Sequence, residues 1–159
     1  MHSNVQRVSD AGRDAGLELE VKRFPEETRT AADAARAIGC EVAQIVKSLV
    51  FIADDRPVVA LVSGVDRVDT ALLATAVGAG AARRATGDEA RSATGFAIGG
   101  VPPFGHAEPL IVLLDPRLLA HEVVWAAAGL PDAVFAIRPE DLVRVSGARV
   151  ADVAESAAA

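Results

Sequence analysis

The stretch that decides the fold is QIVKSLVFIADDRPVVALVS, residues 44–63. Residues 44–53 and 58–63 are apolar and rich in β-branched side chains, and the DDRP segment that joins them is typical of a turn. Strands with such continuous apolar character are usually buried on both faces. The segment therefore predicts a hairpin of two buried strands.

Strands and helices alternate on both sides of this hairpin. Apolar runs bounded by turn residues predict strands, and runs that follow a capping residue predict helices. We expect strands over 17–24, 82–85, 110–114, 123–127 and 134–137, and helices over 31–39, 69–77, 86–93 and 139–145. Residues 1–16 predict a polar helix or a frayed lead-in. This order predicts a single mixed α/β (α+β) domain with one central sheet.

The composition narrows the possible functions. The chain has 159 residues, of which 51% are hydrophobic, and its formal net charge is −6. It is long and apolar enough to form a core, and its acidic balance argues against binding nucleic acid through bulk charge. Its single cysteine, Cys40, excludes an internal disulfide and a zinc site built from cysteines.

No segment predicts membrane insertion or secretion. No run approaches the roughly 20 apolar residues that cross a bilayer, and residues 1–16 lack the apolar stretch of a secretory signal. We therefore expect a cytoplasmic protein with no membrane partner. The phosphate-loop, serine-hydrolase and zinc-peptidase motifs are absent, and the three histidines lack metal-ligand spacing, so we expect no metal and no cofactor.

Lys47 is the first candidate for a functional role. Only two of the 16 basic residues are lysines, and Lys47 interrupts an apolar strand. Period-two alternation places it on the same face as Ile45, Leu49 and Phe51. A buried ammonium group needs an anion or a route to water. Lys47 therefore either ends at the rim of the sheet or points into a pocket, where it meets a ligand oxygen; an ion pair with Asp115 would weaken the second interpretation.

The second candidate is the loop TGFAIGGVPPFGHAEP, residues 94–109, which contains four glycines and three prolines. Prolines stiffen a backbone, and glycines let a ligand approach the main chain closely. Such a loop is suited to holding a reacting ester through fixed main-chain groups, or it is an ordinary connection between a helix and a strand. Within it, His106 is either a general base or a structural residue.

These two features together resemble the YbaK/ProX family of aminoacyl-tRNA deacylases. The likeness rests on Lys47 within QIVKSLVF and on TGFAIGGVPPFGH at 94–106, and it extends over residues 17–153. It implies a mixed, barrel-like β-sheet flanked by helices. It also implies a deacylase domain at 17–153 that is followed by a flexible tail at 154–159.

The resemblance further implies an activity, namely trans-editing hydrolysis of the ester of a mischarged tRNA. The substrate would be tRNA for proline that carries a small amino acid, and no metal would be used. By the resemblance, Lys47, Gly100 and Pro103 are the catalytic residues. Further substrate-binding positions are expected in the same loop, at Thr94, Gly99, Val101, Pro102, Phe104, Gly105 and His106. The implied partners are mischarged tRNA and prolyl-tRNA synthetase, with the protein a monomer or a homodimer.

The sequence departs from part of this family near its second hairpin. Ala127 and Val134 stand where some relatives, including the cysteinyl-tRNA type, carry polar residues. This argues against cysteine and leaves alanine, serine, threonine or another small side chain open. Contact with tRNA would need a local basic cluster, for which the candidates are Arg67, Arg83, Arg84 and Arg91; solvated surface is the alternative.

Two other functions fit the same residues. One is a catalytically silent module that holds a tRNA end, a nucleotide or a partner protein. The other is a hydrolase of small aminoacyl esters that does not require tRNA. Lys47 together with the Gly100–Pro103 loop favours catalysis over the silent module.

Overall fold

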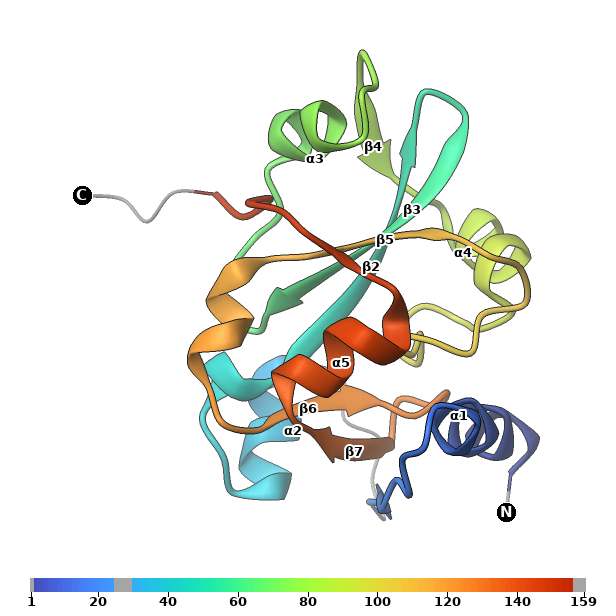
Figure 1. The fold of residues 1–159 in the computed structure, drawn as a ribbon, viewed down its shortest axis with the longest axis vertical. Helices are drawn as coiled ribbons and strands as arrows, with labels where there is room; N and C mark the ends of the chain where they lie inside the picture. Colours follow the sequence, from blue (N-terminus) through green and yellow to red (C-terminus); the bar gives the residue numbers. More distant parts are fainter. Residues whose placement is uncertain (1, 25–29, 156–159) are drawn as a thin grey trace.

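The computed structural model describes residues 2–24 and 30–155, which form one α+β domain with two β-sheets (Figure 1). The five-stranded sheet has the order β4-β2-β3-β5-β8, and the three-stranded sheet has the order β1-β7-β6. The strands are β1 (Val21–Arg23), β2 (Val46–Ala53), β3 (Arg56–Ser63), β4 (Ala82–Arg84), β5 (Ile111–Leu114), β6 (Val124–Ala127), β7 (Ala133–Ile137) and β8 (Arg149–Val150). The helices are α1 (Ser3–Asp14), α2 (Ala31–Ile38), α3 (Thr70–Ala76), α4 (Gly87–Thr94) and α5 (Pro139–Ser146).

The predicted hairpin is confirmed as β2 and β3. The two strands pair antiparallel from Val46↔Ser63 to Ala53↔Arg56. Asp54 and Asp55 form the turn with φ of 50° and 82°, and aspartate is among the residues that tolerate this left-handed conformation in tight hairpins. β4 joins β2 antiparallel, whereas β5 joins β3 in parallel, so the sheet is mixed as expected.

The structure has two sheets where the sequence predicted one. β6 and β7 form their own antiparallel hairpin, to which β1 adds. Within the described residues, the single β-bridge between the sheets is an isolated parallel one between Ile45 and Trp125. The sheets are therefore not closed into a barrel, and a space remains between the edge of β2 and the β6–β7 hairpin.

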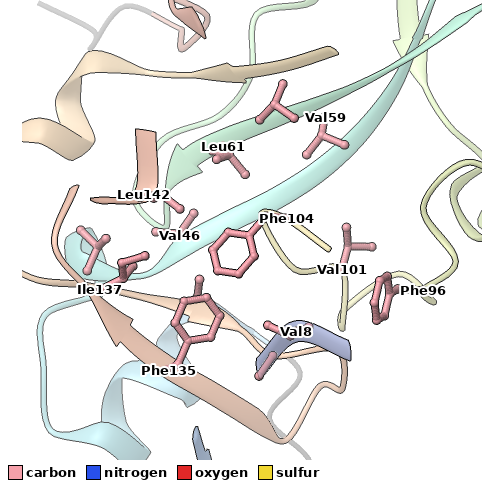
Figure 2. Close-up of a cluster of buried hydrophobic side chains, with 14 of the residues drawn as sticks. Val8, Val46, Val59, Leu61, Phe96, Val101, Phe104, Phe135, Ile137 and Leu142 are labelled. Carbon is pink, nitrogen blue, oxygen red and sulfur yellow. The ribbon is translucent and has the colours of Figure 1, made fainter. Parts of the chain in front are cut away.

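The larger core cluster fills the region between the sheets (Figure 2). Phe104 from the long loop packs against Phe135 of β7, with ring centroids 5.5 Å apart and planes tilted by 49°. Val8 of α1 and Leu61 of β3 belong to the same cluster and are fully buried. A second cluster lies on the opposite face of β2 and β3, where Leu73 of α3 packs.

Helices α2 and α3 each begin at a capping side chain, of which the sequence predicted the first. The Thr30 side chain accepts a hydrogen bond from the Asp33 N–H, and the Asp69 side chain accepts from the N–H groups of Ala71 and Leu72. These caps satisfy amide groups that would otherwise lack partners at helix starts. Within 2–24 and 30–155, no helix combines the length and apolar character needed to span a membrane.

The sequence left two alternatives for the N-terminal segment and predicted a flexible tail at the C-terminus. The N-terminal segment forms helix α1, the first of the two expected alternatives. At the other end, Ala154 is buried and bridges Val68, so ordered packing continues past residue 153 as far as the described chain extends. Residues 156–159, where a flexible tail was expected, lie outside the described residues.

Candidate active site

A cavity of about 310 Å³ is lined by residues of both sheets. Its walls come from β2, the start of α2, the loop after α4, and the β6–β7 hairpin. The lining residues from β2 and its approach are Ile45, Val46, Lys47, Ser48, Leu49 and Val50, and those from elsewhere are Thr30, Ala31, Ala34, Arg84, Ile98, Gly99, Val101, Trp125, Ala126, Ala127, Pro131 and Val134. The cavity is mostly apolar, and among the described residues its charged lining side chains are Lys47 and Arg84.

The cavity forms because one edge of β2 is left open. β4 pairs with β2 only over Phe51–Ala53, and the bridge between Ile45 and Trp125 holds the other end. Between these points, residues 46–50 have β3 on one side and the cavity on the other. An unpaired strand edge presents main-chain donors and acceptors, so this wall can bind a polar ligand although most of its side chains are apolar.

Lys47 lies at this edge and lines the cavity, half-buried. Its Nζ donates a hydrogen bond to the main-chain carbonyl oxygen of Asp66, which follows β3. Burial lowers the pKa of Lys47; the Asp66 carboxylate opposes the shift, while the charges of Arg84 and Arg67 add to it. Asp115 bonds elsewhere, to the main chain of Arg117, Val153 and Ala154.

The four arginines proposed for tRNA contact occupy different environments. Arg84 lines the cavity, with its guanidinium 5.7 Å from the centroid of the Phe51 ring. Arg67 is exposed and close enough for its charge to lower the pKa of Lys47. Arg83 forms a two-pronged ion pair with Glu89 at 2.7 and 2.8 Å, which lowers the pKa of Glu89 to about 2. Arg91 is exposed on α4 and does not line the cavity.

The first half of the predicted loop contributes to the cavity. Gly99 and Val101 line it, and Gly100 lies buried between them. Gly99 has φ of +94°, a conformation that residues with a side chain rarely adopt. The structure thus brings Lys47 and this part of the loop together at one cavity.

The second half of the loop lies outside the cavity wall. Pro102, Pro103 and Phe104 are buried, and Phe104 belongs to the core cluster shown in Figure 2. Gly105 and His106 face a separate shallow depression beside α1. The assignments of these five residues as catalytic or substrate-binding therefore stay predictions.

Two polar side chains hold the loop ends. His106 Nε2 donates to the carbonyl oxygen of Pro102 at 2.8 Å, and burial lowers the pKa of His106. The Thr94 hydroxyl lies within 2.8 and 3.2 Å of the carbonyls of Ala90 and Phe96 and accepts from the Phe96 N–H. Both residues are committed to main-chain partners in the loop, which favours the structural role for His106.

Sequence reasoning missed several residues of the cavity wall. Ser48 and Trp125 line the cavity but were not proposed as site residues. The same holds for Ala31 and Ala34 of α2. Ser48 follows Lys47 directly, and its position as a hydroxyl in an apolar strand was an available signal. Trp125 and the α2 residues reach the cavity only through the tertiary fold, which brings together segments that are separated in the sequence.

Metal ligands are scarce in the described part of the chain. Within 2–24 and 30–155 no group of three or more His, Cys, Asp or Glu side chains is arranged to hold a metal ion.

The chain is similar to several known proteins. A family model described as an aminoacyl-tRNA editing domain matches residues 25–145. A protein of Bacillus subtilis named YwhH, of uncharacterised function, is 31% identical over 84% of the chain and 85% of its own length. The proline–tRNA ligase of Ligilactobacillus salivarius is 34% identical over 69% of the chain, which spans only 19% of that enzyme.

A solved structure is similar over nearly the whole chain. It is described as a candidate trans-editing enzyme for prolyl tRNA synthetase, with a TM-score of 0.92 and 46% sequence identity. The match covers 98% of this chain and 99% of that one. The similarity therefore extends over α1 and both sheets.

Proposed function

Because the chain belongs to the aminoacyl-tRNA editing domain family, we propose that it is a trans-editing deacylase, which removes a wrongly attached amino acid from tRNA. The resemblance found in the sequence is confirmed at the level of the family. The observation that carries the proposal is that Lys47 and the Gly99–Val101 segment line one cavity. A lysine ammonium and a rigid main-chain loop are together suited to positioning an ester.

The reaction is hydrolysis of a single ester bond. Water adds to the acyl carbon, the bond from that carbon to the ribose oxygen breaks, and a proton passes to the ribose oxygen. The products are the free amino acid and the tRNA with its terminal hydroxyl restored. Negative charge develops on the acyl oxygen as water adds, and a donor aimed at that oxygen lowers the barrier.

In this mechanism the ammonium group of Lys47 supplies the positive charge that stabilises the negative charge on the acyl oxygen. An ammonium group has three N–H donors, and in the free protein one of them is bound to the Asp66 carbonyl. That bond fixes the direction of the side chain, and the remaining donors are available to the substrate. Gly99 lines the cavity and has no side chain, which allows the acyl group to approach the main chain of the loop closely.

The size and the lining of the cavity support an amino acid with a small, uncharged side chain as the acyl group that is removed. The cavity volume of about 310 Å³ is at the lower end of the range for ligand pockets. Ala34, Ala127 and Val134 contribute apolar surface to the wall. We propose alanine, serine or threonine as the amino acid removed, and the similarity to proline–tRNA ligase supports tRNA for proline as the carrier.

A panel of charged tRNAs tests the proposal. Purified protein is incubated with tRNA for proline that carries alanine, serine, threonine, cysteine or proline, and the released amino acid is measured against spontaneous hydrolysis. We expect release from at least one of the first three and none from the proline-charged tRNA. No release from any member would contradict a deacylase and favour the silent binding module, and equal cleavage of a free aminoacyl ester would favour the hydrolase without a tRNA requirement.

A further inference from the structure

Ser48 is out of place in its surroundings. It lies on β2 between Val46 and Val50, directly opposite Leu61 of β3, and all three neighbours belong to the apolar core cluster. Its Oγ is buried and makes no hydrogen bond to any residue that the structure describes. A buried hydroxyl without a partner costs folding free energy, and a residue such as valine or alanine would avoid that cost.

The main chain of Ser48 points toward the open edge of β2. The Val50 carbonyl accepts from the N–H of Ala85, which follows β4, at 3.0 Å, whereas the Ile45 carbonyl accepts from Gly64 N–H on the β3 side at 2.8 Å. Main-chain groups alternate sides along a strand, so the groups of Ser48 point the same way as those of Val50. At Ser48 that side is the cavity, because β4 pairs only with Phe51–Ala53.

From these two observations we propose that Ser48 binds the carbonyl oxygen of the aminoacyl ester, with its hydroxyl and its main-chain N–H as donors. The substrate supplies the partner that Oγ lacks in the free protein. Lys47 precedes Ser48, and although their side chains leave opposite faces of β2, both residues line the cavity at its open edge. Donors placed in advance where negative charge develops are worth more in the transition state than in the ground state.

This inference rests on the proposed deacylase function and adds a substrate-binding residue to it. It also predicts an unusual separation between activity and stability. Removing a hydroxyl that has no partner in the free protein should not weaken the fold, yet it should slow the reaction. Ser63 provides the matched control, because it is buried on the neighbouring strand and its Oγ donates to the Ala43 carbonyl at 2.8 Å.

The test measures single-turnover deacylation and thermal unfolding for Ser48→Ala, Ser48→Thr and Ser63→Ala. The probe is whichever of alanyl-, seryl- and threonyl-tRNA for proline the wild-type protein cleaves fastest. We expect Ser48→Ala to lose about 10²- to 10³-fold in the single-turnover rate constant with no decrease in Tm. Ser48→Thr, which keeps the hydroxyl, should retain most of the rate, and Ser63→Ala should lower Tm while it keeps the rate.

A wild-type rate in Ser48→Ala would overturn the inference and leave the deacylase function standing. Equal losses in Ser48→Ala and Ser48→Thr would also overturn it, because the hydroxyl would then not be the cause. Failure of Ser48→Ala to fold would contradict the predicted stability. If the wild-type protein itself cleaves none of the three probes, both this inference and the proposed function fail.

Discussion

Gly100 lies so close to the turn between β6 and β7 that a β-carbon on it would be 3.0 Å from the carbonyl oxygen of Gly129. Gly129 is itself packed against α1, where a β-carbon would be 2.9 Å from the carbonyl oxygen of Asn4. Asn4 Nδ2 donates to that same Gly129 carbonyl at 3.1 Å. The loop that lines the cavity is thus held by backbone-to-backbone contact, through the turn, to α1.

The change Gly100→Ala should displace this loop. The atoms that the new methyl group would meet are main-chain atoms of Gly129 and Leu130, which cannot move away as a flexible side chain can. We expect a loss of about 1–3 kcal/mol in the free energy of unfolding, as for other overpacked sites, with a marked loss of deacylation. Urea unfolding and single-turnover kinetics measure the two effects.

Gly87→Ala is the control for that change. Gly87 opens helix α4, and a β-carbon there would meet nothing within 4 Å. Alanine favours helix more than glycine does, so we expect unchanged or slightly higher stability and unchanged deacylation. Equal stability and equal deacylation in Gly100→Ala and Gly87→Ala would contradict the close contact at Gly100.

The pKa of Lys47 should lie below its ordinary value of 10.5, because the side chain is partly buried and two arginines repel its charge. The unfolded chain then binds this proton more readily, so the free energy of unfolding rises with pH between the two pKa values. Labelling the lysine Cε with ¹³C gives only two signals in this chain, which makes an NMR titration direct.

The same titration tests the role of Arg84. Removing its charge in Arg84→Gln should raise the pKa of Lys47, because one source of repulsion is lost. Lys47→Met assigns the signal. An unchanged pKa of Lys47 in Arg84→Gln would contradict the placement of the two charges at one cavity.

Arg84 and Arg83 should differ in their contribution to tRNA affinity. Arg84 lines the cavity, whereas Arg83 is already paired with Glu89 at 2.7 Å. We expect Arg84→Gln to weaken tRNA binding and to reduce the slope of log affinity against log salt by about 1. Arg83→Gln should change the slope less. Binding titrations at several salt concentrations measure this, and a larger effect of Arg83→Gln would contradict it.

The free energy of unfolding of the protein should depend on His106 in mild acid. Burial lowers the pKa of His106 below its ordinary value of 6.5, with the bond to Pro102 opposing the shift. As the pH falls below 6.5, the unfolded chain takes up this proton first, so the free energy of unfolding falls until the folded pKa is reached. His106→Gln, which keeps a donor but does not titrate, should lose less stability between neutral pH and about pH 5. Equal acid losses in both proteins, measured by urea unfolding, would contradict this.

Much of the fold followed from local signals in the sequence. The apolar runs around DDRP identified β2 and β3, and Thr30 identified the start of α2. These features depend on neighbouring residues, so they can be recognised without knowledge of the partners. The expected strand over 17–24 shortened to Val21–Arg23 because only these residues find partners on β7.

The pairing between distant segments could not be predicted. Alternation shows which face of a strand is buried but not which strand lies beside it, so the division into two sheets was missed. β8 was missed as well, because only two of its residues pair, with Leu113 and Leu114. The same limit applies to the site: Lys47 and the loop were identified, whereas Trp125 reaches the cavity through its bridge to Ile45.

The central claim is that the ammonium group of Lys47 acts at the cavity that the Gly99–Val101 segment also lines. The most direct measurement is single-turnover deacylation by Lys47→Met, which keeps the apolar stem and removes the charge, alongside Lys47→Ala and the wild type. With folding verified by thermal unfolding, we predict a loss of at least about 10²-fold in both variants. A folded Lys47→Met protein that cleaves the charged tRNA at the wild-type rate would contradict the account.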